Sequence, residues 1–511
     1  MARLPVVLVL LHMISAAAAS ESYVIETLPG YPGLLPFKLE TGYIGVGEDE
    51  DLQLFYYFIE SEGDPDKDPL ILWMNGGPGC SGFTGLVYEI GPLNFNLSSY
   101  DGSLPSFILN PYSWTKISSI IFIDSPVGTG FSYTNSPEGY YRSDTKLSMD
   151  NHMFLRKWLL NHPSFLKNRL YMAGDSYGGK IATAVAFEIA KGNEAGLQPW
   201  MNLKVYIVTI FWPWFPGLII STLTSGTLEQ GYMIGNAFTD ADMDVNYRVA
   251  YAHRMAIISD DLAKSSCNNE YVNPDPNNLQ CSYALRLVKE CTQKICTDHI
   301  LEPKCKLSSP RPDDTKWGEA FIEEFPEEHL FQSRHEESSW CRFSFFFLIM
   351  YEAFNMDKQS CWLQFKNYLP SYTWARDDSV QEALGIRKGT KEEEWVRCNR
   401  SSAYTFDVRS VLEYHKLLNE KGYQILAYNG DHDMGVPYIS TLNWIRRLNL
   451  TIEDAWRPWR VDGQIAGYTE KYKEGGGSFI TFATGAGHTA PEYRPKQCFA
   501  MVKRWLSMFP L

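Results

Sequence analysis

Short apolar runs alternate with longer stretches of mixed character along most of this chain. Continuous apolar runs of this kind are typical of strands that are buried on both faces of a parallel sheet. The stretches between the runs have room for helices, so the alternation predicts an α/β fold with a mostly parallel central sheet flanked by helices. The predicted strands are Leu54–Glu60, Leu70–Met74, Ile120–Asp124, Arg169–Ala173, Tyr232–Asn236, Ile425–Tyr428 and Phe479–Ala483.

One long stretch interrupts this alternation. Residues 240–372 are rich in cysteine, charge and loop-forming residues, and we interpret them as a lid inserted over a functional site. Near the end of the chain, Lys496–Met508 has the apolar spacing of a helix that packs on the sheet. The chain has no internal repeats, and we assign residues 20–511 to one α/β domain that includes the lid insertion.

The first 19 residues have the pattern of a secretory signal peptide. Arg3 supplies the positive start, Leu4–Ile14 the apolar stretch, and a run of alanines the cleavage region. The apolar stretch is too short to span a membrane comfortably. The signal predicts the secretory pathway, with an extracellular or vacuolar destination. Ten cysteines and the glycosylation sequons at Asn96, Asn399 and Asn449 agree with that route.

A glycine-framed serine follows one of the predicted strands. Gly174-Asp175-Ser176-Tyr177-Gly178 lies between the apolar run Leu170–Ala173 and the helix-compatible segment Lys180–Ala186. Strand, tight turn and helix form the context in which G-x-S-x-G is a nucleophile elbow. The flanking glycines permit the sharp turn that exposes the serine hydroxyl. Ser176 is therefore the candidate nucleophile.

Two partners follow in the order that this fold requires. Ile425–Tyr428 leads into a turn that contains Asp433, and Phe479–Ala483 leads into Gly485-Ala486-Gly487-His488. Acidic residue and histidine come after the serine, as in α/β hydrolases. We expect His488 to act as general base and then as general acid, and Asp433 to orient its imidazole.

A glycine pair after an early strand completes the predicted machinery. Leu70–Met74 runs into Asn75-Gly76-Gly77-Pro78-Gly79, where a bare backbone N–H can face a carbonyl oxygen. The second donor of an oxyanion hole is the N–H of the residue after the nucleophile. Gly77 and Tyr177 are the candidate donors, although a Gly/Pro cluster can also be only a turn.

Composition narrows the function classes. The 511 residues carry a formal net charge of −14 with scattered basic residues, which argues against a nucleic-acid partner. The sequence contains neither a phosphate-binding glycine-lysine run nor HExxH, and its cysteine spacings do not suggest a zinc site. We therefore expect neither a metal nor a cofactor.

Taken together, these motifs resemble the serine carboxypeptidase family, in its plant carboxypeptidase-like branch. The resemblance extends over nearly the whole chain and implies an α/β-hydrolase fold that works through an acyl-enzyme. It is carried by Trp73–Ser81, Phe122–Tyr133, Gly174–Gly178, Gly235-Asn236, Gly430–Asp433 and Gly487-His488.

The resemblance also implies a site for a substrate carboxylate. The family binds the free carboxylate of a peptide through an asparagine and an acidic residue, and Asn75 and Asp175 occupy those positions. Peptidases of the family typically carry glutamate where this chain has Asp175. Aspartate there resembles the acyltransferase branch, as do the residues around Asp433 and His488. Members of that branch move an acyl group from a 1-O-glucose ester to an alcohol or acid acceptor.

Three disulfides are implied by the resemblance and by nothing else in the sequence. Connectivity does not follow from ten cysteines alone. The implied pairs are Cys80–Cys398, Cys267–Cys281 and Cys305–Cys361, which leave Cys291, Cys296, Cys341 and Cys498 over.

The apolar segment 205–230 is an anomaly. It has no charge before Glu229, but Pro213, Pro216 and Gly217 break a membrane-spanning helix in its middle. Related chains run directly from Lys204 into Gly231. The segment is a whole number of codons that can begin with GT and end with AG. We favour an intron retained in the gene model, with a genuine loop, a buried core element or a membrane span as alternatives.

Three functions are open at this point. We favour an acyltransferase that uses 1-O-glucose esters in secondary metabolism, with the acyl-glucose and its acceptor as small-molecule partners. The first alternative is a serine carboxypeptidase that acts on peptide C-termini. The second is an inactive secreted binding protein on the same scaffold.

Overall fold

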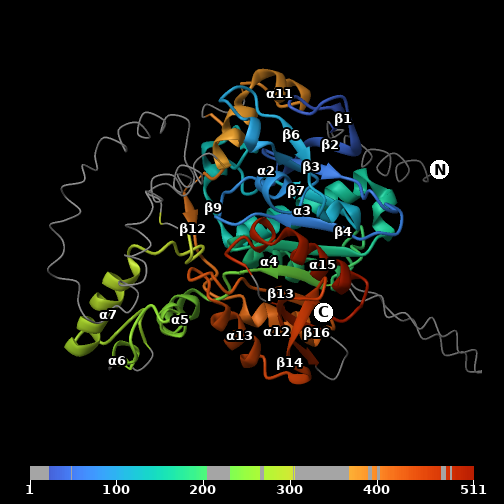
Figure 1. Cartoon of the computed structure of the whole chain (residues 1–511). Helices are drawn as coiled ribbons and strands as arrows, with labels where there is room; N and C mark the ends of the chain where they lie inside the picture. The colour runs from blue at the N-terminus through green and yellow to red at the C-terminus, as the bar shows by residue number, and fades with distance from the viewer. Residues whose placement is uncertain are drawn as a thin grey trace, which may run out of the picture.

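A computed structural model describes residues 22–47, 49–203, 231–264, 267, 270–302, 304, 367–389, 394–399, 403–473, 479–483 and 486–511. One twelve-stranded sheet runs through them in the order β1-β2-β3-β7-β4-β10-β11-β13-β16-β15-β14, with β8 paired to β3 (Figure 1). Its strands are β1 Ser22–Thr27, β2 Leu34–Val46, β3 Leu52–Ile59, β4 Leu70–Met74, β7 Ser119–Ile123, β8 Tyr133–Thr134, β10 Leu170–Asp175, β11 Gly231–Gly235, β13 Gln424–Tyr428, β14 Thr451–Val461, β15 Gln464–Lys473 and β16 Phe479–Ala483.

The middle of the sheet is parallel and both of its ends are antiparallel. Strands β7, β4, β10, β11, β13 and β16 pair in parallel, whereas β1–β2–β3 and β16–β15–β14 pair antiparallel. The fold class is the expected α/β-hydrolase type. Every predicted strand is present, and its bounds differ by two residues at most. The antiparallel strands at the two ends were not predicted, except for β3.

Helices cover both faces of the sheet. The longer helices, of which α5 and α7 belong to the predicted lid, are α3 Asp144–Asn161, α4 Tyr177–Glu194, α5 Ala241–Arg254, α7 Leu279–Thr292, α12 Leu412–Glu420, α13 Tyr438–Arg447 and α15 Pro495–Leu506. Shorter turns are α2 Gly82–Thr84, η1 Gly85–Glu89, η2 Leu97–Ser99, η3 Trp114–Lys116, η4 Pro137–Tyr140, η5 Pro163–Lys167, α6 Asp260–Ala263, α11 Asp378–Ala383 and α14 Ala490–Tyr493. Two small ladders join β5 Leu93–Phe95 to β6 Phe107–Leu109, and β9 Arg142–Ser143 to β12 Tyr404–Thr405.

Alternate residues of each central strand enter two separate cores. In β4, Leu70 and Leu72 pack with Trp158 of α3 and Ile181 of α4 on one face. Trp73 packs on the other face, in the cluster that also contains α15. Because both faces are covered, every residue of β4 is buried, which explains its unbroken apolar run.

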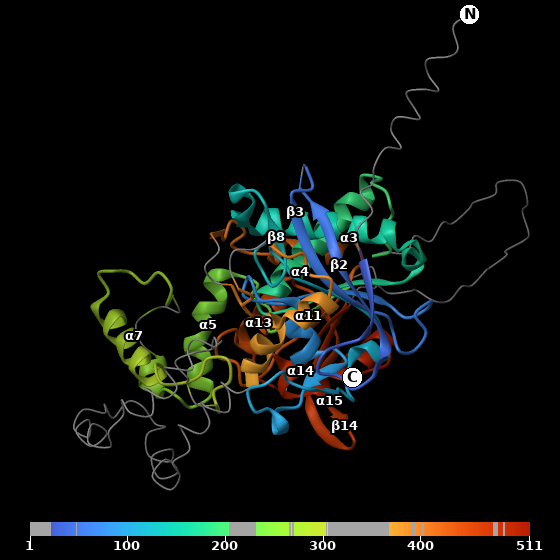
Figure 2. The same ribbon diagram turned by 90° about the horizontal axis from the view of Figure 1, so that it is seen from above.

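Part of the predicted lid stands to one side of the sheet. Helices α5, α6 and α7 lie together at one side of the sheet (Figures 1 and 2), and they share a small apolar core with Met434 and with Ile439 of α13. Cys267 is bonded to Cys281 at the start of α7. The predicted signal peptide, the insert 205–230, the rest of the lid at 305–366 and the Cys305–Cys361 pair lie outside the described residues.

The described helices and cysteines bear on the expected membrane spans and disulfides. Within the described ranges, no helix is both long enough and apolar enough to cross a bilayer. Cys291 is disulfide-bonded, so the expectation that it is left over is wrong. Cys296 and Cys498 are free thiols, as the assignment of pairs implied.

Candidate active site

Ser176 lies in the turn between β10 and α4. Its φ of 54° and ψ of −126° are strained for a residue with a side chain, as expected at a nucleophile elbow. The turn also requires glycine. A Cβ on Gly178 would lie 2.1 Å from the carbonyl oxygen of Met74, and a Cβ on Gly76 would lie 2.7 Å from the Cβ of Ser176. The turn at Ser176 and the loop after β4 can thus pack closely only because glycine, without a Cβ, occupies these positions.

The structure brings the three candidate triad residues into one hydrogen-bonded row. His488 Nε2 lies 2.7 Å from Ser176 Oγ, and His488 Nδ1 lies 2.6 Å from Asp433 Oδ2. The three residues are separated by up to 312 positions in the chain. They meet because β10, β13 and β16 are parallel, so that the turns after them lie at the same edge of the sheet.

The carboxylate of Asp433 is fully buried and is saturated with donors. Asn236 donates to Oδ2 at 2.8 Å, and the backbone N–H groups of Gly435 and Val436 donate to Oδ1 at 2.7 and 3.1 Å. Asn236 directly follows β11 and also accepts from the N–H of Gly430. It therefore fixes both the carboxylate and its turn. The sequence named Asn236 only as part of a motif and assigned it no role.

The electrostatics at His488 favour its charged form. Burial by itself would lower the pKa of this imidazole, but the nearby Asp433 carboxylate and their hydrogen bond raise the pKa above its usual range, with a smaller contribution from Asp298. The same interactions stabilise the imidazolium that forms when a base takes a proton from a serine.

The loop with the candidate oxyanion donor is held on two sides. Gly77 has a φ of 117°, which favours glycine. The loop pairs with residues 397–399 through Ser81 N to Arg397 O and Asn399 N to Gly79 O, and Cys80 is bonded to Cys398. Tyr177 is the first residue of α4, where no helical carbonyl reaches its N–H. Tyr177 follows Ser176 directly in the chain, and Gly77 follows Gly76, where a Cβ would lie 2.7 Å from the Cβ of Ser176.

A buried ionic cluster lies behind Tyr177. Lys180 Nζ is 3.2 Å from Asp144 Oδ2 and 3.0 Å from the Tyr177 hydroxyl, and the two charged side chains are 2% and 1% exposed. The hydroxyl groups of Tyr177 and Tyr404 both donate to Asp144 Oδ1, and Val408 N donates to Oδ2. The cluster joins the start of α4 to α3 and to residues 404–408. Sequence reasoning did not identify it.

The candidate carboxylate site contains an acidic residue that the sequence did not reveal. The Asn75 amide donates to both oxygens of Glu89 at 2.9 and 3.1 Å, and Asn75 Oδ1 accepts from Gly85 N. Asp175 is 3% exposed, and its Oδ1 has no hydrogen-bond partner among the described residues. The structure thus offers two buried carboxyl groups, Asp175 and Glu89, near one amide.

Burial raises the pKa of both carboxyl groups. The pKa of Asp175 rises to about 6, and hydrogen bonds from its own backbone and from Gly76 oppose the rise. The pKa of Glu89 rises well above its usual range, because burial is reinforced by the charges of Asp175 and Glu492. One or both groups are therefore protonated in mildly acidic solution, and a protonated carboxyl group donates a hydrogen bond to a carboxylate ligand.

The three predicted glycosylation sites differ in the folded chain. Asn96 is partly exposed and Asn449 is exposed. Asn399 is only 7% exposed, and its Nδ2 donates to Gly128 O at 3.1 Å. A glycan would be attached to this nitrogen, so Asn399 is the least accessible of the three predicted sites in the fold. The sequon pattern reports local sequence and not the packing of the asparagine.

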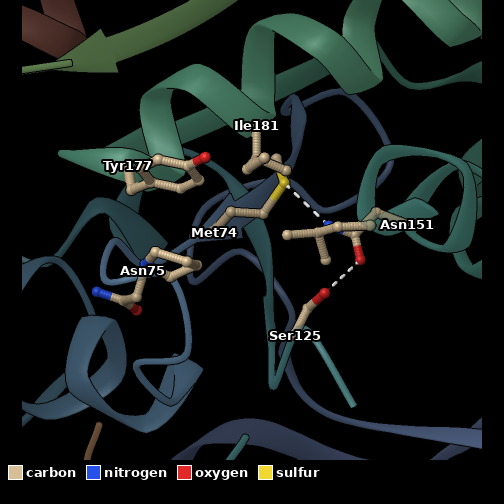
Figure 3. Close-up of a pocket in the computed structure, with 8 residues that line it drawn as sticks. Met74, Asn75, Ser125, Asn151, Tyr177 and Ile181 are labelled. Carbon is tan, nitrogen blue, oxygen red and sulfur yellow. Dashed lines mark hydrogen bonds between the residues drawn. The ribbon is translucent and has the colours of Figure 1, made fainter. Parts of the chain in front are cut away.

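A small cavity lies behind the oxyanion loop (Figure 3). It is lined by Met74, Asn75, Pro78, Ser125, Leu147, Asn151, Tyr177 and Ile181. Figure 3 shows Ser125 donating to Asn151 and Asn151 donating to the sulfur of Met74, so these polar groups satisfy one another. Neither Ser176 nor His488 lines the cavity, which therefore belongs to the packing around the loop.

Fold and geometry together define an α/β hydrolase with a serine, histidine and aspartate in contact. Comparison with known proteins is more specific. The serine carboxypeptidase family model matches residues 29–209 and 227–508, and the chain belongs to this family. The match leaves out residues 210–226, which lie within the anomalous insert.

Individual relatives agree with this membership, and a solved structure shares the fold. The chain is 40% identical to serine carboxypeptidase-like 17 of Arabidopsis thaliana over 509 residues, which cover 99% of this chain and 96% of the relative. It is 41% identical to serine carboxypeptidase-like 1 of the same plant, covering 99% and 97%. Its fold resembles a prohormone-processing carboxypeptidase from Saccharomyces cerevisiae, with a TM-score of 0.63, 17% identity and 95% of each chain covered.

Proposed function

We propose that this chain is a secreted serine enzyme that forms an acyl-enzyme on Ser176. The observation that carries the proposal is the unbroken hydrogen-bond path from Ser176 through His488 to the buried Asp433. His488 Nε2 takes the hydroxyl proton as the oxygen attacks an ester or amide carbon, and Asp433 stabilises the resulting imidazolium. The N–H groups of Gly77 and Tyr177 receive the developing oxyanion.

Collapse of the tetrahedral intermediate breaks the bond to the leaving group, which takes its proton from His488 and departs. The acyl group then remains as an ester of Ser176. A second nucleophile gives its proton to His488 as it attacks this ester, and His488 passes that proton to the serine oxygen as the acyl bond breaks, which restores the free serine. Water as second nucleophile gives hydrolysis, and an acceptor hydroxyl gives transfer.

Within this chemistry we favour an acyltransferase that takes its acyl group from a 1-O-glucose ester. Support comes from Asp175, which replaces the glutamate typical of the peptidases, and from the residues around Asp433 and His488. Asp175 Oδ1 has no partner among the described residues, so it is a buried acceptor that a ligand hydroxyl can satisfy. A carboxypeptidase that acts on peptide C-termini is the second candidate, because Asn75 with Glu89 and Asp175 also suits a carboxylate.

One assay separates the candidates. Aromatic 1-O-glucose esters with an alcohol acceptor, and blocked dipeptides, are offered side by side to the parent and to Ser176→Ala. A transfer product absent from the variant supports the acyltransferase, and a released amino acid supports the peptidase. Asp175→Glu is the matched variant, since it restores the peptidase residue and should move the balance toward peptide cleavage.

An inactive binding protein is the remaining alternative. A fluorophosphonate probe reacts only with an activated serine, so it tests this alternative without knowledge of the substrate. We expect labelling at Ser176. A folded parent chain that resists the probe would favour the binding protein.

A further inference from the structure

Four consecutive residues of the insertion bind both turns that carry the acid–base pair. We call Thr297–Ile300 the strap. Thr297 O accepts from the N–H groups of Met434 and Gly435, at 2.8 and 3.0 Å, in the turn of Asp433. Asp298 O accepts from His488 N at 2.9 Å, and Ile300 N donates to His432 O at 3.0 Å. One short segment thus makes four backbone hydrogen bonds with two turns.

The two turns also meet directly. They are joined by His432 N to Ala486 O at 3.0 Å and by the His488–Asp433 bond itself, and a Cβ on Gly430 would lie 2.0 Å from Ala486 O. The strap adds a second support on the other side of this contact. The N–H groups that the strap receives belong to His488 and to the two residues after Asp433. Gly435 N is shared between Thr297 O and Asp433 Oδ1, so the strap and the carboxylate are aligned through one donor.

The half-buried side chain of His299, in the middle of the strap, packs against the residues around both turns. The His299 ring lies 5.0 Å from the His432 ring and 4.8 Å from the Tyr493 ring, measured between centroids. It also faces Gly487, where a Cβ would lie 2.6 Å from His299 Cδ2 and 3.1 Å from Asp298 O. His299 Nδ1 accepts from Leu301 N at 3.3 Å, which holds the ring in this orientation. The ring therefore occupies the space between the two turns and α14.

We propose that the strap is a positioning element for Asp433 and His488, and that His299 is the side chain that holds it against them. His299 does not touch Ser176 or the reacting atoms, and acts only through the two turns. The inference rests on the proposed function, because it concerns the same acid–base pair. It assigns part of the catalytic geometry to the insertion, which lies outside the sheet.

The test compares two histidines of the insertion. His299→Ala removes the ring that packs between the turns. The control His253→Ala removes an exposed ring on α5 that is hydrogen-bonded to Asp260. Both full-length variants are measured with p-nitrophenyl acetate and with the fluorophosphonate probe. We expect His299→Ala to lower kcat and the labelling rate by roughly ten- to a hundredfold with little change in KM, since small displacements of a catalytic base cost that much.

Two further measurements separate positioning from stability. His299→Phe keeps the ring and should restore most of the rate, whereas a loss of fold would not be corrected so specifically. Hydrogen exchange should speed up in peptides that cover 430–436 and 486–490 of His299→Ala and stay unchanged in α4. Equal rates in the His299→Ala and His253→Ala variants, or a His299→Phe variant as slow as His299→Ala, would overturn the proposal. A parent that neither labels nor turns over ester would instead overturn the proposed function.

Discussion

The two halves of the candidate site are held by different means. The nucleophile half, Ser176 and Tyr177, is built into β10 and α4 and is supported by the nearly unexposed pair Lys180 and Asp144. The acid–base half consists of two turns whose outer support is the strap, in which Asp298 is exposed and His299 only partly buried. The sheet positions the turns of all three residues, and we propose that the turns of the acid and the base need the strap as well. Variants of the support on the first side, Lys180 and Asp144, should fail by unfolding, whereas variants in the acid–base half should fail by lost rate.

The largest effect is expected when the hydroxyl oxygen of Ser176, on which both halves act, is removed. Ser176→Ala should abolish covalent labelling by the fluorophosphonate and all acyl-enzyme turnover, because no nucleophilic oxygen remains. The thermal unfolding midpoint should stay close to that of the parent, since only an oxygen is lost. Persistent labelling of the variant, located by mass spectrometry at another residue, would contradict the assignment.

Asp433→Asn should break the acid–base half without unfolding it. The amide has nearly the same shape, but its nitrogen cannot accept from His488 Nδ1, and we expect kcat to fall by about 10³–10⁴-fold. Asp433 raises the pKa of His488, so the variant should reach its plateau of base activity at a lower pH than the parent. The measurement is the labelling rate between pH 4 and 9. A plateau that stays at the same pH would show that Asp433 does not set this titration.

Lys180→Met should weaken the nucleophile half by lowering the free energy of unfolding. It leaves the Asp144 carboxylate buried without its cation, although two tyrosine hydroxyls and one backbone N–H still donate to it. Removing one partner of a buried ion pair costs about 3 kcal/mol of unfolding free energy. Urea unfolding measures this cost. Lys191→Met, on the exposed face of the same helix, is the matched control and should change stability little. Similar midpoints for the two variants would show that the cluster adds nothing.

Asp175→Asn should have the smallest effect, and its sign depends on pH. The folded pKa of Asp175 is raised to about 6, so ionisation opposes folding. That penalty is absent below its ordinary pKa near 4 and is complete above about 6. The neutral amide should therefore stabilise the fold by about 1–3 kcal/mol near pH 7 and by nothing near pH 4. A stability difference independent of pH would contradict the shifted titration.

The sequence predicted those parts of the site that local patterns encode. The glycines around Ser176 and the strands before Asp433 and His488 are short-range signals, and parallel pairing brings their turns to one edge. Glu89 has no such signal. It sits in the irregular turn η1, 14 positions after Asn75, and reaches it only through packing. The strap has no sequence signal either, because its four hydrogen bonds to the turns use backbone atoms that any sequence possesses.

The missed strands have a related cause. Strand β14 is largely exposed, and both it and β15 mix polar and apolar residues, so neither forms an apolar run. Asn399 shows the opposite limit, because a clear local motif does not reveal that distant residues bury the asparagine. Apolar runs that indicate burial on both faces of a strand predicted the central strands correctly. Features that arise from long-range packing have no local pattern and were missed.

Strand β14 also has a consequence for how the molecules behave in solution. Among the described residues it is the last strand of the sheet and presents an unpaired edge, which in other proteins invites a second chain to add a strand and start an aggregate. Its register with β15 shifts at three places, and Pro458 lacks an N–H to offer. At the opposite end, β1 has only six residues. An irregular edge and a short one leave the large sheet with no regular edge that a neighbouring copy can extend.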